Sequence, residues 1–457
     1  MLRVFHHYFS GRKLLFFIAE SAAIGVAALV GAGALALWIS PAGTSVPPDR
    51  ALLQLGLFGL AMVALFQFAL YAADLYDLKV ASEDLGGGGA RLLKAAGVAA
   101  FTVGLGGMAL RIRVPAGVLL GGALGAVAGA MAVRVALRVR LGQPAPVLLL
   151  GDGLKARSLA RMIREGGEGA FSVCGMVEPP REGEEEAGPA LDALALRHRA
   201  RYVVVALDEP RGTRWVDALI RCRLAGIQVH DGSGFCERVL RRLPISHLNP
   251  AELAFAERLT ASPVRRAFKR AFDVLAGLAL LLLALPVGLV VAAAIKLDSP
   301  GPIFYGQERV GLGGRAYRLW KFRSMRQDAE RGGAVWARQN DDRVTRVGRF
   351  IRKARIDELP QIYNVLHGDM SLVGPRPERP VFVHQLRRQI PFFGLREMVK
   401  PGITGWAQIR YPYGASVEDA RNKLELDLYY VKNGSLFLDL AIIFHTVRHV
   451  LMGRGAR

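Results

Sequence analysis

Two adjacent carboxylates with arginines on both sides are the residues of this chain whose types and spacing could do chemistry. Asp357 and Glu358 follow one another directly, and the same region supplies four arginines, Arg349, Arg352, Arg355 and Arg376. One carboxylate can attack phosphorus as a nucleophile, a second can hold a hard cation, and guanidinium groups bind phosphate oxygens in pairs. The combination predicts a site for phosphoryl transfer, whereas arginines alone would predict only phosphate binding.

A structural alternative exists for each acid taken alone. A helix cap or a surface ion pair would account for one of the two carboxylates. It accounts poorly for two acids, several arginines and Lys321 together, so we favour the catalytic interpretation. Histidine chemistry is not indicated, because the histidines of this region show no metal-ligand spacing: His367, His384, His445 and His449.

The chain is both hydrophobic and strongly basic. It has 457 residues, of which 52% are hydrophobic, and a formal net charge of +21. That pairing is typical of a membrane protein whose basic faces meet anionic lipid or phosphorylated substrates, and the length allows two or three domains. Nucleic acid is disfavoured as a partner, since no helix-turn-helix, zinc-finger or RRM signature accompanies the charge. The three cysteines are scattered, which fits a reducing compartment and excludes a disulfide framework.

Four apolar stretches occupy the first third of the chain, at residues 14–39, 52–71, 92–110 and 114–133. Each approaches the ~20 residues that a membrane-spanning helix needs, so residues 1–142 are predicted to form a four-helix transmembrane bundle. A cleaved signal peptide explains the first stretch poorly, because the stretch is too long and lacks a small-residue cleavage site. Lysines and arginines lie before the first stretch, between the second and the third, and after the fourth, which places both ends of the bundle in the cytoplasm. Arg111 and Arg113, between the third and fourth stretches, argue against this orientation.

Residues 143–262 have the pattern of an α/β domain. Strands are predicted at residues 147–150, 171–177 and 202–206, with a helix at 154–163, and such alternation implies a Rossmann-like parallel sheet. Gly151 and Gly153 lie between the first strand and the helix, where a dinucleotide fingerprint belongs, and Glu178 ends the next strand as a ribose ligand would. A strand-to-helix turn also needs glycine for its own geometry. We favour the turn, with nucleotide binding as the alternative.

A fifth apolar segment, at about residues 274–295, is long enough to span a membrane. Spanning would place Asp357 and Glu358 outside the cell, and the basic residues at both ends of the segment also disfavour it. Pro286 stands in the middle, where its ring removes a helical hydrogen bond and forces a kink. We therefore predict a re-entrant helix that enters and leaves by the cytoplasmic face, with a spanning helix as the alternative.

Six blocks of the C-terminal part match one known family in the expected order. They read KRAFD at residues 269–273, SPGPIF at 299–304, KFRSM at 321–325, DELPQ at 357–361, GDMSLVGPRP at 368–377 and KPGITGW at 400–406. On these blocks, residues 269–457 resemble the bacterial sugar transferases, the monotopic phosphoglycosyl transferases, and the whole chain resembles the long form of that family. In the family a serine precedes the kink proline. Here Leu285 does, which removes a hydroxyl that could bond a freed carbonyl.

The resemblance implies a multi-pass enzyme of the bacterial inner membrane with its active site facing the cytoplasm. It would transfer a sugar 1-phosphate from a nucleotide sugar, with UDP as the expected carrier, to undecaprenyl phosphate and release the nucleoside monophosphate, in the first membrane step of exopolysaccharide or O-antigen assembly. Matched residue by residue, Asp357 would form a phospho-aspartate and Glu358 would bind Mg²⁺. The phosphate-binding residues would be Lys321, Arg352 and Arg376. The other arginines either take part or only line a basic face toward anionic lipid.

The fold predicted for the whole chain is a helical transmembrane bundle, a cytoplasmic α/β domain and, at residues 263–457, a mostly α-helical catalytic domain with the re-entrant helix. Two amphipathic segments, residues 349–356 and 424–431, and a loop around Trp406 are predicted to lie at the membrane surface. Asp369 is predicted to be a turn residue.

Two other functions compete with the transferase. A membrane scaffold or regulator with an inactive transferase domain is disfavoured by the complete set of acids and cations. A polytopic transferase with its site between spans is disfavoured because the acids follow the last candidate span. A homodimer is compatible with a bundle joined to an α/β domain, and the identity of the sugar is not readable from the pattern.

Overall fold

The computed structural model describes residues 2–4, 7–9, 17–30, 60–61, 63–70, 85–109, 116–141, 144–166, 171–178, 191–208, 214–248, 262–326, 343–411, 414 and 416–451. The chain divides into two compact units, Met1–Phe235 and Cys236–Arg457. Each unit is described by itself. The domain boundaries predicted at residues 142 and 262 stay a prediction.

The first unit opens with a short hairpin of β1 (Leu2–Val4) and β2 (His7–Phe9), followed by apolar helices. The helical segments are Phe17–Val30, residues 60–61 and 63–70, α4 (Leu85–Ala109) and α5 (Ala116–Leu141). Each of the four predicted apolar stretches contributes a helical segment. One buried cluster joins them through Ile24, Phe66, Leu92 and Ala126. In α5, residues Ala116–Ala136 are long and apolar enough to cross a membrane, judged by length and composition.

Small residues bring α5 close to the helix Phe17–Val30. A Cβ atom on Gly125 would lie 2.0 Å from the carbonyl oxygen of Ala27, and one on Gly129 would lie 2.5 Å from that of Ala23. Glycines four residues apart therefore let two backbones approach, as in many membrane-helix pairs. The same two helices share a buried ion pair, since Arg134 Nη2 lies 2.7 Å from Glu20 Oε1.

The first unit also contains a four-stranded parallel sheet, of which the sequence predicted the parallel arrangement and three of the strands. Its strands are β3 (Ala145–Leu150), β4 (Phe171–Val177), β5 (Tyr202–Val205) and β6 (Gln228–Asp231), in the order β4-β3-β5-β6. The associated helices are α6 (Leu154–Gly166), α7 (Leu191–Arg197), α8 (Arg214–Leu224) and α9 (Gly232–Phe235). The first strand lies between the second and third, an order typical of flavodoxin-like sheets and different from the dinucleotide-binding Rossmann order.

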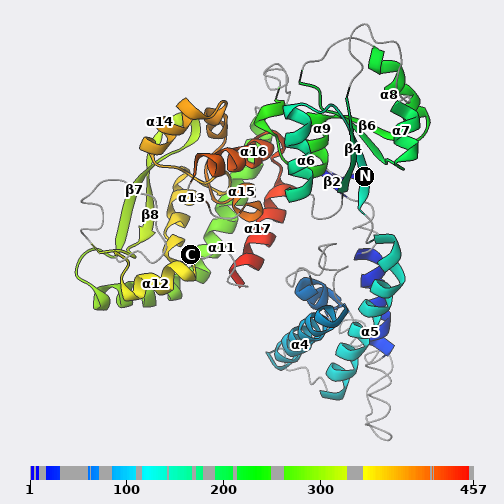
Figure 1. Ribbon diagram of the computed structural model, residues 1–457. Helices are drawn as coiled ribbons and strands as arrows, with labels where there is room; N and C mark the ends of the chain where they lie inside the picture. Colours follow the sequence, from blue (N-terminus) through cyan, green and yellow to red (C-terminus); the bar gives the residue numbers. More distant parts are fainter. Residues whose placement is uncertain are drawn as a thin grey trace, which may run out of the picture. The chain divides into compact units, whose positions relative to one another are not determined.

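The second unit is mostly helical and holds the predicted site (Figure 1). After two short helices, η1 (Cys236–Leu240) and η2 (Ile245–His247), comes the long helix α11 (Pro263–Asp298). An antiparallel hairpin follows, made of β7 (Phe304–Val310) and β8 (Ala316–Phe322) with η3 (Leu312–Gly314) at its tip. The hairpin lies beside α13 (Gln361–His367), through β8.

The remaining elements complete this unit. They are α12 (Arg346–Lys353), η4 (Ile356–Glu358), β9 (Ser371–Val373), α14 (Pro380–Gln389), η5 (Phe393–Met398), β10 (Gly402–Thr404), α15 (Trp406–Arg410), α16 (Val417–Asn433) and α17 (Leu436–Leu451). Strands β9 and β10 pair in parallel. The main core includes Met370, Trp406, Leu424, Tyr429 and Ile442.

Helix α11 runs without interruption through Pro286 and extends beyond the predicted residues 274–295 at both ends. Like α5, it is long and apolar enough to cross a membrane, judged by length and composition. Its middle is apolar and exposed, with Leu282 at 74% and Leu289 at 66% exposure. A core helix of a soluble protein would bury such side chains, so this part of α11 is suited to lipid. The re-entrant path stays a prediction.

Two predictions of membrane-surface segments are wrong. Residues 424–431 of α16 are all buried, and Trp406 is only 2% exposed and donates from Nε1 to the carbonyl oxygen of Arg241. The prediction for residues 424–431 takes their polar members to face the membrane surface. In the fold, the polar members Glu425 and Asp427 are instead paired with arginines inside the protein.

Candidate active site

The two carboxylates lie in a tight turn between α12 and α13. Arg355 precedes them with φ 56°, in the left-handed region that non-glycine residues rarely adopt. The 3-10 turn η4 then carries Asp357 and Glu358. Such backbone strain persists only where the surrounding structure holds it, and it is frequent at functional sites. The turn therefore fixes the direction of both carboxylates.

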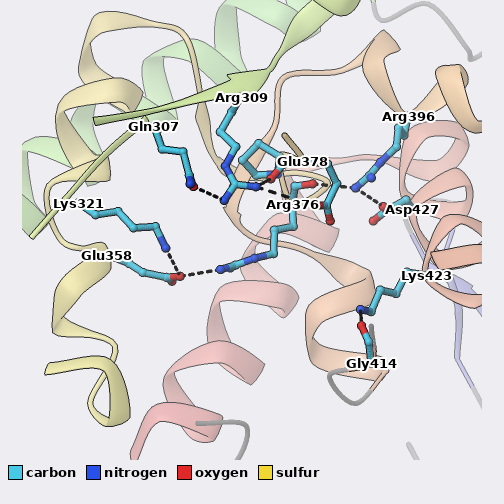
Figure 2. Close-up of polar contacts among 11 residues, drawn as sticks. Gln307, Arg309, Lys321, Glu358, Arg376, Glu378, Arg396, Gly414, Lys423 and Asp427 are labelled. Carbon is cyan, nitrogen blue, oxygen red and sulfur yellow. Dashed lines mark hydrogen bonds and ion pairs between the residues drawn. The ribbon is translucent and has the colours of Figure 1, made fainter. Parts of the chain in front are cut away.

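Glu358 is held by three cationic side chains. Its Oε1 accepts hydrogen bonds from Lys321 Nζ at 3.2 Å and Arg376 Nη2 at 2.8 Å, and its Oε2 lies 3.8 Å from Arg355 Nη1. Figure 2 shows Lys321 and Arg376 reaching the same oxygen from opposite sides. Burial opposes ionisation, but the charges of Arg376 and Lys321 outweigh it and hold the pKa of Glu358 well below its usual range. Glu358 is therefore a permanent anion at neutral pH.

Asp357 is in a different electrostatic state. It is buried, and Lys321 Nζ lies 3.9 Å from its Oδ2. Burial raises the pKa of Asp357, the charge of Lys321 opposes the rise, and the neighbouring charge of Glu358 adds to it. A carboxylate stripped of water in this way is a stronger nucleophile than a hydrated one. The surroundings therefore shift the pKa values of the two acids in opposite directions, upward for Asp357 and downward for Glu358.

The structure brings the predicted residues together from separate elements. Lys321 lies on β8, Arg376 follows β9, and Arg352 lies on α12, from where its charge favours the ionised form of Asp357. Pro286 lies in α11. Burial lowers the pKa of Lys321, while the charge of Glu358 opposes that effect.

Helix α12 is anchored on the C-terminal half of α11. Asp298 Oδ2, at the last residue of α11, accepts a hydrogen bond from the backbone N–H of Val347 at 3.1 Å. Ile351 packs with Val291 and Ile295 of α11. Thr345 caps α12 by accepting from the N–H of Gly348 at 2.9 Å. The long apolar helix therefore positions the turn that carries the acids.

Residues of four of the sequence blocks hold the ends of elements. Arg270 donates to the carbonyl oxygens of Val365 and Leu366 at the end of α13. Asp273 accepts from the hydroxyl of Ser371 at 3.0 Å and the N–H of Leu372 at 3.1 Å, which ties α11 to β9. Arg323 donates to the carbonyl oxygen of Ser299, the residue after α11, at 2.7 Å. The contacts of Arg270 and Arg323 satisfy carbonyl groups at helix ends, and the contact of Asp273 satisfies an N–H of β9.

Sequence reasoning missed three residues around Arg376. Arg309, Arg396 and Asp427 lie outside the blocks that indicated the site, and only the fold brings them to it. Asp369 behaves as the predicted turn residue: its Oδ2 lies 3.1 Å from His367 Nδ1 and 3.4 Å from Asn364 Nδ2.

The acids can be tested as ligands for magnesium. Within the described ranges, no group of three or more His, Cys, Asp or Glu side chains is gathered around one point. Mg²⁺ often uses only one or two carboxylates and takes its other ligands from water and substrate phosphates. Asp357 and Glu358 supply that number of oxygen donors, and Glu358 is ionised. The donor set therefore fits Mg²⁺ in the presence of a phosphorylated substrate.

The glycine turn of the parallel sheet is already filled by a carboxylate. Asp208, in the loop after β5, accepts from the backbone N–H groups of Leu154 and Lys155 at 2.9 Å each, at the start of α6. Gly151 has φ +128°, and a Cβ on Gly153 would lie 1.8 Å from Asp208 Oδ2. A bound phosphate would occupy this same helix N-terminus at the switch point of the sheet. The chain's own carboxylate takes that place.

The family match among known proteins falls within the second unit. The family model described as bacterial sugar transferase matches residues 264–453. The chain is 48% identical over 266 residues to a UDP-N-acetylgalactosamine-undecaprenyl-phosphate N-acetylgalactosaminephosphotransferase of Aeromonas hydrophila, covering 58% of this chain and 62% of that protein. It is 35% identical over 323 residues to an undecaprenyl-phosphate glucose phosphotransferase of Komagataeibacter xylinus, covering 68% and 60%.

The match to a third relative covers a larger share of that relative's own length. A UDP-glucose:undecaprenyl-phosphate glucose-1-phosphate transferase of Caulobacter vibrioides is 44% identical over 185 residues, which are 40% of this chain and 69% of that protein. The chain therefore belongs to the bacterial sugar transferase family. It spans about three fifths of the length of the first two relatives.

Proposed function

We propose that this protein transfers a sugar 1-phosphate from a nucleotide sugar to undecaprenyl phosphate and releases the nucleoside monophosphate. The names of the relatives support this reaction, and two of these names include a UDP-sugar as the donor. The observation that carries the proposal is the pairing of a desolvated Asp357 with an ionised Glu358 among Lys321, Arg352 and Arg376. The product would start exopolysaccharide or O-antigen assembly.

The reaction divides into two displacements at phosphorus. In the first, a carboxylate oxygen of Asp357 forms a bond to the phosphorus beside the sugar, the phosphoanhydride bond breaks, and the nucleoside monophosphate leaves with the bonding electrons. In the second, a phosphate oxygen of undecaprenyl phosphate bonds to the same phosphorus, and the aspartyl–phosphorus bond breaks. The Asp357 carboxylate is then restored. Two steps suit this reaction, because a lipid phosphate is a weak nucleophile.

Lys321 and Arg376 hold the acids before substrate arrives and would hold phosphate afterwards. Both donate to one oxygen of Glu358, so their remaining N–H donors can turn to the diphosphate. Arg352 adds positive charge next to Asp357. Glu358, with Asp357 beside it, would bind Mg²⁺, which supplies charge neutralisation for the phosphate oxygens when it is bound.

The membrane arrangement is part of the proposal. Residues 1–142 would form a four-helix transmembrane bundle, residues 143–262 a cytoplasmic α/β domain, and residues 263–457 the catalytic domain of a protein of the bacterial inner membrane. Helix α11 would be re-entrant, and basic side chains would meet anionic lipid. Cysteines in place of Val264 and Leu297, which are exposed at the two ends of α11, should react with an impermeant reagent from the same side. Reaction from opposite sides would establish a spanning helix.

The reaction is tested with purified protein, undecaprenyl phosphate and a panel of UDP-sugars. Continuous release of UMP over many turnovers should require both the UDP-sugar and undecaprenyl phosphate. It should be lost in Asp357→Asn. Glu418→Gln, at an exposed position in the first turn of α16, is a matched control that should keep full activity. If no nucleotide sugar gives UMP while the protein is folded, the chain is instead a scaffold with an inactive transferase domain.

A further inference from the structure

The segment Pro375-Arg376-Pro377-Glu378 carries the guanidinium that binds Glu358 and leads from β9 to α14. Proline has no backbone N–H. Much of the hold on this segment must therefore come through its carbonyl oxygens.

All four carbonyl oxygens of the segment are bonded. Pro375 accepts from the N–H of Gly402 at 3.0 Å, and Glu378 accepts from the N–H of Val310 at 3.0 Å. Between them, Arg376 accepts from Arg396 Nη2 at 2.7 Å, and Pro377 accepts from Arg309 Nη1 at 3.0 Å. Two outer contacts come from backbone and two inner contacts come from guanidinium groups. Charge-assisted hydrogen bonds of this kind are stronger than neutral ones.

The two guanidinium groups are themselves fixed. Arg396 Nη2 lies 2.9 Å from Oδ2 of Asp427, which is 2% exposed on α16. Figure 2 shows Arg396 reaching both Asp427 and the backbone of Arg376. Arg309 Nη2 donates to Gln307 Oε1 at 2.6 Å, and its Nη1 lies 3.9 Å from Glu378 Oε2. The guanidinium groups of Arg396 and Arg309 are therefore each held in place by a further side chain.

We propose that Arg396 and Arg309 are positioning residues for Arg376. They hold the main chain on which Arg376 is mounted, and so keep its guanidinium at 2.8 Å from Glu358 and in place for the substrate phosphates. Asp427 holds Arg396. The role rests on the proposed function, in which Arg376 binds phosphate.

The proposal is tested by a double-mutant cycle in the purified full-length protein. Arg396→Met alone should lower kcat/KM for the UDP-sugar by ~10²-fold, the size expected when a catalytic group is misplaced by about 1 Å. Arg376→Ala should also lower it. In the Arg376→Ala background, however, Arg396→Met should change kcat/KM less than threefold, because Arg396 acts through Arg376. Equal losses in both backgrounds would overturn the proposal and indicate a general structural role.

A second variant guards against loss of folding. Arg396→Met leaves Asp427 without its partner, whereas Arg396→Met with Asp427→Asn removes the buried charge as well. The double variant should fold and show the same loss of kcat/KM as Arg396→Met. Recovery of wild-type activity in it would overturn the proposal. Arg388→Met, at an exposed position of α14, controls for the loss of one positive charge and should behave as wild type.

Failure of the proposed function gives a different result. If wild-type protein transfers no sugar phosphate, the thermal unfolding temperature of the same four proteins of the cycle is measured instead of kcat/KM. The effects of Arg376→Ala and Arg396→Met should then still be non-additive, because the Arg376–Glu358 contact depends on the held backbone. Additive effects would overturn the positioning role independently of the reaction.

Discussion

Glu358→Gln is expected to destabilise the protein, whereas Asp357→Asn is expected to leave it as stable or to stabilise it. Oε1 of Glu358 accepts bonds from Lys321 at 3.2 Å and Arg376 at 2.8 Å. A hydrogen bond to a charged group contributes about 1.5–3 kcal/mol, and Arg376, at 38% exposure, counts for less because solvent screens it. We therefore expect a loss of roughly 2–4 kcal/mol for Glu358→Gln, which leaves two cations without their carboxylate.

The opposite sign for Asp357 follows from its pKa. Burial raises that pKa, so the ionised carboxylate is less favourable in the folded protein than in the unfolded chain. A near-isosteric neutral amide removes this cost. Thermal unfolding in detergent at pH 7.5 should show Tm lower by about 4–16 °C for Glu358→Gln, and equal or higher for Asp357→Asn. A Glu358→Gln variant as stable as wild type would refute this account of the site's electrostatics.

The pH dependence gives a second check on the same reasoning. The folded-state pKa of Glu358 is lowered below that of an unfolded glutamate, about 4.3. Its stabilisation is therefore complete above that pH and is lost as the pH falls below it. The difference in Tm between wild type and Glu358→Gln should narrow as the pH is lowered from about 5 to 3. A constant difference would mean that shape, not charge, is responsible.

Three further predictions concern Lys321, Gly125 and Gly153. Lys321→Met removes a charge that favours ionised Asp357, so the acid limb of the kcat/KM profile should move to higher pH, and an unmoved limb would contradict the assignment of that limb to Asp357. Gly125→Leu should separate α5 from the helix Phe17–Val30 and lower Tm and folded yield, with the exposed Leu124→Ala as control; an unchanged Tm would refute the close packing. Gly153→Val should reduce folded yield more than the specific activity of the folded fraction, because its side chain would collide with Asp208, and normal yield would contradict that contact.

The glycine turn of the α/β domain leads to a further prediction, that the glycines serve the geometry of the turn and not nucleotide binding. Because Asp208 occupies the N-terminus of α6, we expect no dinucleotide at this turn. Glu178→Ala should leave turnover within a few-fold of wild type. Purified protein that retained a stoichiometric nucleotide, lost together with activity in Glu178→Ala, would show instead that the domain is a working regulatory site.

Local patterns in the sequence predicted local structure well. The strand at residues 171–177 has the predicted bounds, because Gly169 stands shortly before it and Pro179 shortly after it, and such turn residues mark the ends of a strand. The acids and Arg352 could also be predicted as site residues, since they lie within one short stretch. Arg376 was predicted with them as one of the arginines near the acids, the role of Lys321 came from the match to family blocks, and the fold brings both to Glu358.

Patterns that depend on distant partners could not be predicted in the same way. Arg396 and Asp427 are separated along the chain and meet only when α16 packs beside η5. Residues 424–431 contain both apolar and polar residues, which suits an interfacial amphipathic helix as well as a core helix with buried ion pairs, so the sequence predicted a membrane surface. The difference is decided by the partners of the polar residues, which a single sequence does not reveal.

The central claim is that Asp357 carries the sugar phosphate between the two substrates. Purified protein should be incubated with a UDP-sugar labelled at the β-phosphate, without undecaprenyl phosphate, then quenched and digested for mass spectrometry. The account predicts one sugar phosphate on the peptide that contains Asp357, removed on addition of undecaprenyl phosphate and absent from Asp357→Asn. Transfer that proceeds in the wild type with no labelled protein, or in Asp357→Asn at a comparable rate, would contradict it.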